Sequence, residues 1–235
     1  MCSKLTEEQL LCESHFVKTT QRDNDGRFEV RLPFKTDVSV LGKSYEIAKR
    51  RFLALERKVD KDPKLRELYV AFMKEYIHLG HMSPIKNEIP TTPHYFIPHQ
   101  CVLRAQSTTT KLRVVFDASS KTSTLVSLNE TLMVGPTIQK DLFSALLQFR
   151  LNMYAITADI TKMYRQVRVH KDDRKFQLIL WRERPDIPIQ SYELNTVTYG
   201  TAPAPFLAIR CLKEISDIFK GVYPLGSSVV AKDFY

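Results

Sequence analysis

The sequence predicts an α+β fold, with a helical segment first and β-hairpins with packed helices after it. Two apolar stripes at helical spacing lie within residues 44–79, and runs of strand length begin at residue 99. Over 235 residues, 43% are hydrophobic and 26% are charged, which is ordinary for a globular protein and allows a sizeable core. We therefore expect one large domain or two small ones.

The charge of the chain is basic and unevenly shared. The formal net charge is +9, of which residues 1–90 carry +3 and residues 91–235 carry +6. Such an excess favours nucleic acid or another polyanion as a partner, above all for the second part of the chain. Basic proteins without such partners are nevertheless common, so the charge alone does not decide the function.

The cysteines and the N-terminus indicate the compartment. The four cysteines are widely spaced and lack a CxxC pair, which fits free thiols in a reducing compartment. The N-terminus carries acidic residues and no apolar core of the kind found in secretory signals, and no apolar run reaches the length of a membrane span. We expect a cytoplasmic or nuclear protein that is not secreted and has no membrane partner.

Helix signals dominate the first third of the chain. A short helix is predicted over residues 5–17, with Thr6 as its N-cap. A helical hairpin is predicted over residues 44–79, in which Asp62 and Pro63 suit the N-cap and first position of the second helix. The apolar stripes of this hairpin are typical of core packing.

The division of the chain follows from its prolines. Residues 1–82 form the predicted N-terminal helical segment, with a half-exposed strand at residues 27–34. Four prolines punctuate residues 83–98, which we interpret as an extended linker because prolines exclude a helix there. Residues 99–235 form the second predicted unit.

The second unit opens with a predicted β-hairpin. Its strands are residues 99–104 and 112–116, joined by a polar tip. Arg104, Lys111 and Arg113 lie at or beside this tip, where they can close over phosphates. Judged alone, the simpler interpretation is an ordinary polar loop.

Helices and strands alternate in the rest of the chain. An amphipathic helix is expected at residues 141–150, and a helix from about residue 206 to 219. Strands are expected at residues 176–181 and 191–198, followed by a Gly/Pro break at residues 199–205.

The stretch that organises this unit is a predicted strand at residues 153–158, which ends at Asp159. A carboxylate at the end of a buried strand is costly without a partner, and a divalent cation is one such partner. A basic segment with an aromatic residue follows, formed by Lys162, Tyr164, Arg165, Arg168 and His170. Taken alone, this stretch favours a turn aspartate followed by a solvated charged face.

Several separated blocks change that balance. They are TTTKLRVVFDAS (108–119), SLNETLMVGPTIQKDLFSALLQFR (127–150), ITADITKMYRQVRVHKDDRKFQLILW (156–181) and ELNTVTYGTAPAPFLAIRCL (193–212). Together they resemble the reverse transcriptase of BEL/Pao-class LTR retrotransposon polyproteins, and GRFEVRLPF resembles the region preceding it. The resemblance implies a helical N-terminal segment followed by partial right-hand polymerase fingers and palm. It also implies an RNA-directed DNA polymerase that transfers deoxynucleotides with two Mg²⁺ ions.

The resemblance gives roles to residues near the organising stretch. Asp159 matches the first metal-binding catalytic carboxylate, and the backbone carbonyl of Ile160 matches a further Mg²⁺ ligand. Tyr164 matches the steric gate that excludes a ribose 2′-hydroxyl. The cations Lys162, Arg165 and Arg168 are expected to bind the nucleic acid.

Other matched positions concern the incoming nucleotide. Arg104 and Arg113 match the cationic fingers positions, where a planar guanidinium suits stacking and phosphate contact. Tyr199 and Gly200 match the turn beneath the nascent base pair. Many retroviral relatives have Gln where this chain has Tyr199, so a hydrogen-bonding role at that position does not transfer.

The end of the chain departs from the family pattern. The family's Tyr-Val-Asp-Asp motif, with the remaining catalytic carboxylates, would overlap Tyr235 and extend beyond it. We therefore expect a fragment of the Pol polyprotein that is inactive alone. Its partners would be RNA or DNA primer–template, deoxynucleoside triphosphates and the rest of the polyprotein, in a cytoplasmic particle or the nucleus. The alternatives are a non-catalytic nucleic-acid-binding remnant and an inert pseudogene product.

Overall fold

The computed structural model of the chain describes residues 5–85, 91–103, 112–151, 153–154 and 156–234. The α-helices are α1 (Glu7–Thr19), α2 (Tyr45–Val59), α3 (Pro63–His78), α4 (Leu128–Thr131), α5 (Leu142–Arg150), α6 (Ala204–Phe219) and α7 (Pro224–Lys232). The 3₁₀ helices are η1 (Val38–Val40), η2 (Met163–Gln166) and η3 (Arg174–Phe176). The strands are β1 (Gln21–Arg22), β2 (Phe28–Val30), β3 (Met82–Pro84), β4 (His99–Leu103), β5 (Leu112–Phe116), β6 (Arg168–Val169), β7 (Leu178–Trp181) and β8 (Gln190–Leu194).

Helices and small sheets pack together, in agreement with the predicted α+β class. The strands β3, β8 and β7 form an antiparallel sheet in that order, and β4 pairs with β5 in the predicted hairpin. A third sheet joins β1, β2 and β6, of which β2 and β6 are parallel. This third sheet connects the N-terminal segment with the organising stretch of the second unit.

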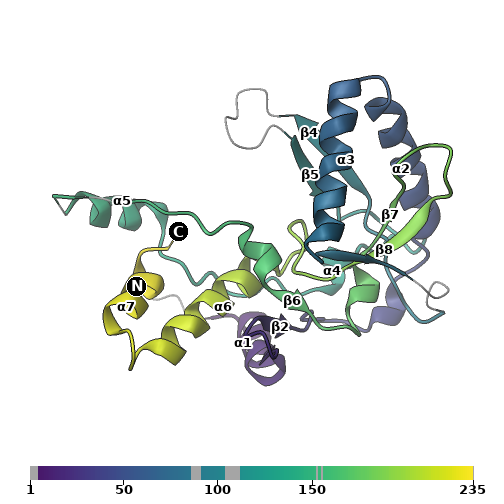
Figure 1. Cartoon of the computed structure of the whole chain (residues 1–235). Coiled ribbons are helices and arrows are strands. Elements are labelled where there is room, and N and C mark those ends of the chain that lie inside the picture. Colours follow the sequence, from purple (N-terminus) through teal and green to yellow (C-terminus); the bar gives the residue numbers. More distant parts are fainter. Residues whose placement is uncertain (1–4, 86–90, 104–111, 152, 155, 235) are drawn as a thin grey trace.

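The helical hairpin α2–α3 covers the β4–β5 hairpin and the β3–β8–β7 sheet, as Figure 1 shows. Helix α2 packs against β4 and β7, and α3 packs against β5 and β3. The predicted apolar stripes are buried, including Phe52 in α2 and Met73 in α3. The Asp62 carboxylate accepts hydrogen bonds from the backbone N–H groups of Lys64 and Leu65, both at 3.1 Å, which confirms the predicted N-cap.

The described part of the predicted linker is extended but packed. Tyr95, Phe96 and Ile97 are fully buried. Their backbone pairs with the start of β7: the Ile97 N–H donates to Leu178 O at 2.6 Å, and the Leu178 N–H donates to Tyr95 O at 3.0 Å. The prolines therefore set an extended conformation that lies beside β7 within the core.

Helix α1 is held against α6 by a buried arginine. Arg210 lies in α6, and its guanidinium bonds Glu13 and Glu214, each at 2.7 Å. The same guanidinium lies 4.7 Å from the centroid of the Phe16 ring in α1. The predicted Thr6 cap is also present, as a capping box with Gln9.

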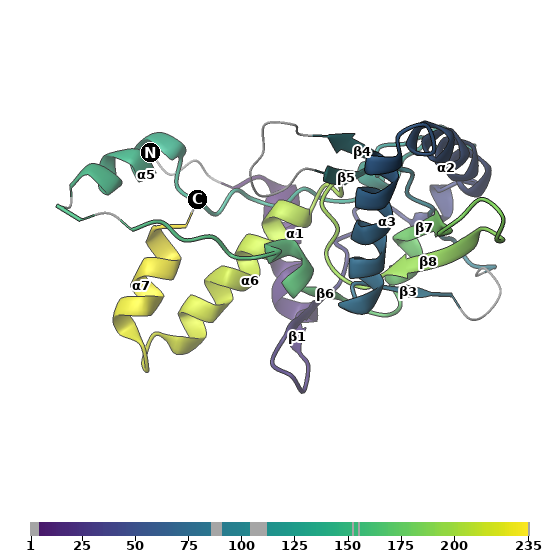
Figure 2. The same ribbon diagram turned by 45° about the horizontal axis from the view of Figure 1, so that its top comes forward.

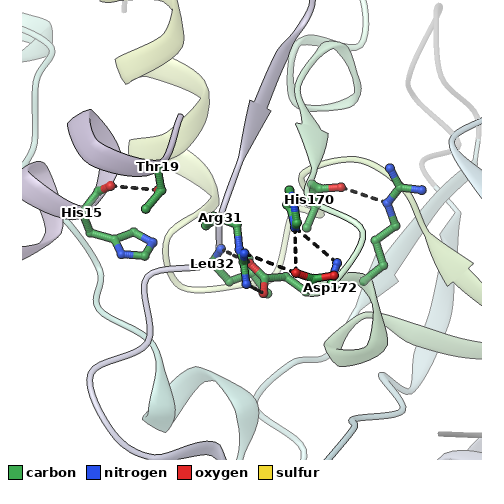
Figure 3. A network of polar contacts seen from close by, with 9 residues as sticks. His15, Thr19, Arg31, Leu32, His170 and Asp172 are labelled. Atoms are coloured by element: carbon green, nitrogen blue, oxygen red, sulfur yellow. Dashed lines mark hydrogen bonds and ion pairs between the residues drawn. The ribbon is translucent and has the colours of Figure 1, made fainter. Parts of the chain in front are cut away.

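A polar network joins the segment after β2 to the loop after β6, as Figure 3 shows. The Arg31 guanidinium donates two hydrogen bonds of 2.8 Å to the two carboxylate oxygens of Asp173. The Leu32 N–H donates to Asp173 as well, at 2.9 Å. Asp173 is buried, so these three donors supply the partners that a buried carboxylate needs.

The prediction of a strand at residues 153–158 is wrong. The described residues 153–154 and 156–158 lie in no strand, and their side chains face solvent, with Met153 89% and Ile156 92% exposed. A strand needs a neighbour for its backbone hydrogen bonds, and none of the described residues pairs with this segment. Helix α5, predicted as amphipathic, forms with Asp141 as N-cap, but it has no buried residue.

Within the part of the chain that the structure describes, no helix is both long and apolar enough to cross a membrane.

Candidate functional site

Three predicted nucleotide-binding residues converge on one surface, although they come from separate elements. Arg113 lies in β5, Tyr164 in η2, and Tyr199 in the turn before α6. The Arg113 guanidinium carbon lies 5.8 Å from the centroid of the Tyr199 ring. The same positive charge acts on Tyr164, where it opposes the rise of the pKa. Of the other two predicted residues, Gly200 follows Tyr199 in the same turn, and Arg104 lies outside the described residues.

Gly200 allows the turn to approach the end of β5 closely. Its φ is +100°, a backbone conformation that favours glycine, and a Cβ at this position would lie 2.1 Å from the Phe116 carbonyl oxygen. Asn129 holds the other side of the turn: its side-chain amide donates to Gly200 O at 3.0 Å and accepts from the Ala202 N–H at 2.8 Å. The turn is therefore fixed by backbone geometry and by one amide.

Tyr199 is packed beneath Arg113 by aromatic neighbours. Its ring centroid lies 5.4 Å from that of Phe116, and its hydroxyl shares a hydrogen bond with the Tyr76 hydroxyl. Burial raises the pKa of Tyr199, which the Tyr76 hydrogen bond and the charges of Arg165 and Arg113 oppose. Tyr199 therefore remains a neutral ring near neutral pH, suited to packing against another planar group.

Tyr164 owes its position to a sharp turn at the end of the organising stretch. Lys162, two residues earlier, has φ +55° in the left-handed region, and η2 begins directly after it. The ring of Tyr164 is half-buried against the hydrophobic core, and burial raises its pKa. Part of the ring stays accessible beside the exposed Arg113, where it can contact a bound molecule.

Two of the three predicted nucleic-acid-binding cations are engaged by one carboxylate. Lys162 Nζ lies 2.7 Å and Arg165 Nη1 3.1 Å from the same oxygen of Glu75 in α3. Burial opposes ionisation of Glu75, but the hydrogen bonds from both cations outweigh it and lower its pKa. Burial and these cations also lower the pKa of the nearby His81 to about 4.

The third cation is paired as well. Arg168 lies 2.9 Å from Asp23 and 3.3 Å from Asp25, both in the turn between β1 and β2. A phosphate that binds Lys162, Arg165 or Arg168 would therefore have to displace or share a carboxylate of this chain. Arg113, by contrast, is exposed beside two tyrosine rings, which makes it the most available of the predicted cations that the structure describes.

The predicted Mg²⁺ ligands do not form a two-metal site in the described residues. Asp159 is exposed at the end of an unpaired segment, and Ile160 follows it half-buried. No group of three or more His, Cys, Asp or Glu side chains placed to hold a metal ion occurs among the described residues. One carboxylate and one carbonyl are too few for two Mg²⁺ ions, so these residues alone do not fit the expected metal pair.

The prediction from sequence missed the residues that support this surface. By its helical spacing Tyr76 belongs to the apolar stripe of α3, and its hydroxyl contact with Tyr199 depends on how α3 crosses β5. Asn129 lies in one of the quoted blocks, but nothing in its local sequence shows that it clamps residues 200–202. Glu75 is an ordinary surface acid by sequence and becomes the counter-charge of two cations only in the fold.

Comparisons with known proteins do not assign a family. A scan against protein-family models gives no match, and a search of curated proteins also gives none.

Proposed function

We propose that this chain forms the nucleotide-binding part of the fingers and palm of a reverse transcriptase, in a polyprotein like those of BEL/Pao-class retrotransposons. The observation that carries the proposal is the meeting of Arg113, Tyr164 and the Tyr199–Gly200 turn on one surface. These residues come from three separate sequence blocks, and the resemblance assigns all of them to the incoming nucleotide.

The chemistry of this surface suits a deoxynucleoside triphosphate. An exposed guanidinium can bind phosphate oxygens in pairs and stack on a base, which a lysine cannot do. The accessible edge of the Tyr164 ring offers an apolar contact for a sugar without a 2′-hydroxyl. The turn at Tyr199 and Gly200 is already fixed, so this part of the backbone would lose little conformational freedom when a nucleotide binds.

The exposed apolar surfaces support the same proposal. Helices α5 and α7 and residues 153–158 carry large apolar side chains that face solvent, among them Phe143, Tyr154 and Leu225. Exposed patches of this kind mark surfaces that other polypeptide covers. In a polymerase palm, strands carrying the remaining metal ligands would cover them and give the 153–158 segment a partner.

The direct test is nucleotide binding by the 235-residue protein, measured by equilibrium dialysis of labelled dTTP and UTP. Arg113→Ala should weaken dTTP binding about tenfold, because it removes a charge-assisted phosphate contact. The matched control is Arg50→Ala, an exposed arginine in α2 far along the chain from the site. Tyr164→Ala should reduce the preference for dTTP over UTP. Equal dTTP binding by Arg113→Ala and the unchanged protein would contradict the proposal.

Primer extension tests the catalytic part separately. We expect only background extension of a DNA primer on an RNA template with Mg²⁺, because the described residues bring together no carboxylate cluster for the metals. Extension that is abolished by Asp159→Ala would contradict this expectation and show that the chain holds its metals in another way.

The alternative of a non-catalytic duplex-binding remnant has less support. Its expected contacts, Lys162, Arg165 and Arg168, are all paired with carboxylates of the chain. Non-specific phosphate binding should therefore be weak and should fall steeply with salt, which fluorescence anisotropy of a labelled duplex measures. Tight binding that persists at 200 mM salt would favour this alternative.

A further inference from the structure

An apolar cavity lies between α6, η2 and the turn that joins β1 to β2. Figure 1 labels β2 and β6 in this part of the molecule, and Figure 2 labels β1 and β6. Its volume is about 280 Å³. The described residues that line it come from β1 and β2 with their turn, from residues 160–167 around η2, and from one side of α6. None of the proposed nucleotide-binding residues is among them.

The walls of the cavity are built by regular structure. Ala208, Leu212 and Ile215 follow one another at helical spacing along one side of α6. Met163 and Val167 face them from η2 and its end. Burial also raises the pKa of the Cys211 thiol to about 12, so this side chain stays neutral and adds to the apolar wall. A ligand would therefore meet mostly hydrocarbon.

The polar part of the lining is positive. Arg22 and Arg27 are its charged residues, and no acidic residue lines it among those described. Arg22 is fixed in place: its Nε donates to Gly26 O at 2.9 Å, and its guanidinium lies 5.0 Å from the Phe28 ring centroid. Arg27 also lines the cavity, while its positive charge acts on His81, where it helps to lower the pKa. The cavity thus combines an apolar interior with the guanidinium of Arg22 beside it.

The acids of that turn are already occupied. Asp23 and Asp25 lie between the two arginines in sequence, and both are paired with Arg168 at 2.9 and 3.3 Å. Among the described residues, Arg168 is therefore the cation that forms ion pairs with these two carboxylates, rather than Arg22 or Arg27. A carboxylate brought by a ligand can meet Arg22 beside the apolar lining.

We propose that this cavity binds a small amphiphile with an apolar chain and one carboxylate, of the medium-chain fatty-acid class. The apolar chain would fill the space between α6 and η2, and the carboxylate would meet Arg22. The volume is just below the range of about 300–1,000 Å³ typical for drug-sized ligands, which suits a compact chain. The proposal does not rest on nucleotide binding, because Arg113, Tyr164, Tyr199 and Gly200 do not line the cavity; Ile160, a predicted Mg²⁺ ligand through its backbone carbonyl, does line it.

Binding would also act on the organising stretch. Ile160 and Met163 line the cavity, and they flank the turn at Lys162 that positions Tyr164. A ligand in the cavity would restrain this segment between Asp159 and η2. Slower amide hydrogen exchange of residues 160–167 on ligand addition would report that restraint.

The test is isothermal titration calorimetry of the 235-residue protein with decanoate, and with decanol as the probe without a carboxylate. We expect decanoate to bind with a dissociation constant of about 0.1–1 mM, given the efficiency usual for small ligands. Decanol should bind about tenfold more weakly, and Arg22→Gln should weaken decanoate about fivefold without affecting decanol. Arg50→Gln, in α2, is the charge control.

Cavity-filling variants locate the binding. Ala208→Trp and Met163→Trp each place a large ring in the cavity and should abolish decanoate binding, whereas Met153→Trp, at an 89% exposed position, should not. Circular dichroism checks that each variant is folded, and Met163, being partly exposed, tolerates the change better than the buried Ala208. Two results overturn the proposal: no heat of binding with the folded protein, or binding that survives Met163→Trp but is lost in Phe143→Asp on α5.

Discussion

Two regions of the molecule have similar apolar composition, but the apolar side chains of one are buried in the core and those of the other face solvent. We call α2, α3, β4, β5, β7, β8 and residues 95–97 the body. We call α5, α7 and the described residues 151, 153–154 and 156 the limb. Figure 2 shows body and limb at opposite ends. In the body, Phe96 and Met73 are fully buried. In the limb, Phe143 is 70% and Leu151 83% exposed.

The contrast between body and limb shows that a helix with an N-cap and apolar residues is not necessarily buried. Helices α3 and α5 both begin at an aspartate that caps backbone N–H groups, Asp62 in one and Asp141 in the other. Helix α3 faces β5 and β3, whereas α5 has no buried residue. An apolar face contributes to stability only when another layer removes it from water, so the body carries the stability of the fold.

The largest expected effect separates the two regions directly. Phe96→Ala should lower the free energy of unfolding by about 3–5 kcal/mol, because it leaves a cavity in the core. Phe143→Ala on α5 should change it by less than about 0.5 kcal/mol, because its ring already faces water. Urea unfolding followed by circular dichroism measures both. Equal effects would mean that the limb is covered in solution.

Two glycines with positive φ, Gly200 and Gly80, differ in how closely other atoms approach them. Gly200→Ala should cost about 2–4 kcal/mol, since the new Cβ combines an unfavourable φ with a clash against Phe116 O. Gly80→Ala has a similar positive φ of +68° but no atom within 4 Å of the new Cβ, and should cost only about 1 kcal/mol. Thermal unfolding of both variants tests this; similar losses would show that the approach to Phe116 is unimportant.

The third effect depends on pH and comes from a buried histidine of β4. Burial lowers the pKa of His99 to about 4, and its Nε2 lies 2.7 Å from the Tyr69 hydroxyl. Between about pH 6.5 and 4 the unfolded chain binds a proton that the folded protein does not, so stability falls as the pH falls. The loss is up to about 3 kcal/mol for one such group.

His99→Gln should flatten this dependence while keeping a polar partner for Tyr69. It should not remove the dependence entirely, because the pKa of His81 is also lowered to about 4. The measurement is urea unfolding at pH 7, 6, 5 and 4.5. An unchanged slope of stability against pH in the variant would show that His99 is not the group responsible.

The smallest expected effect compares the two caps. Asp62→Ala should lower the free energy of unfolding by about 1 kcal/mol, because it leaves N–H groups of α3 unpaired. Asp141→Ala removes the equivalent bond of 2.8 Å to Ser144 in α5, but should leave global unfolding unchanged and only speed local amide exchange. A global loss with Asp141→Ala would show that α5 unfolds together with the body.

Local signals in the sequence predicted much of the fold and part of the site. The caps at Thr6 and Asp62 form as predicted, because each depends on contacts within four residues. Helix α6 begins at Ala204, two residues before the predicted start, with Pro205 at its first turn. The resemblance also named Arg113, Tyr164 and Tyr199, but only the fold brings them together.

Local sequence patterns predicted α1, the α2–α3 pair, α5, α6 and the β4–β5 and β7–β8 pairs, because these depend on local spacing and backbone preference. The residues of the candidate site were named by the family resemblance. Tertiary packing settled which apolar faces are buried. It left residues 153–158 without a strand, because strand hydrogen bonds need a distant neighbour that local pattern does not supply. It also paired Lys162 and Arg165 with Glu75, because a counter-charge about 90 residues away in the chain becomes a neighbour only through packing.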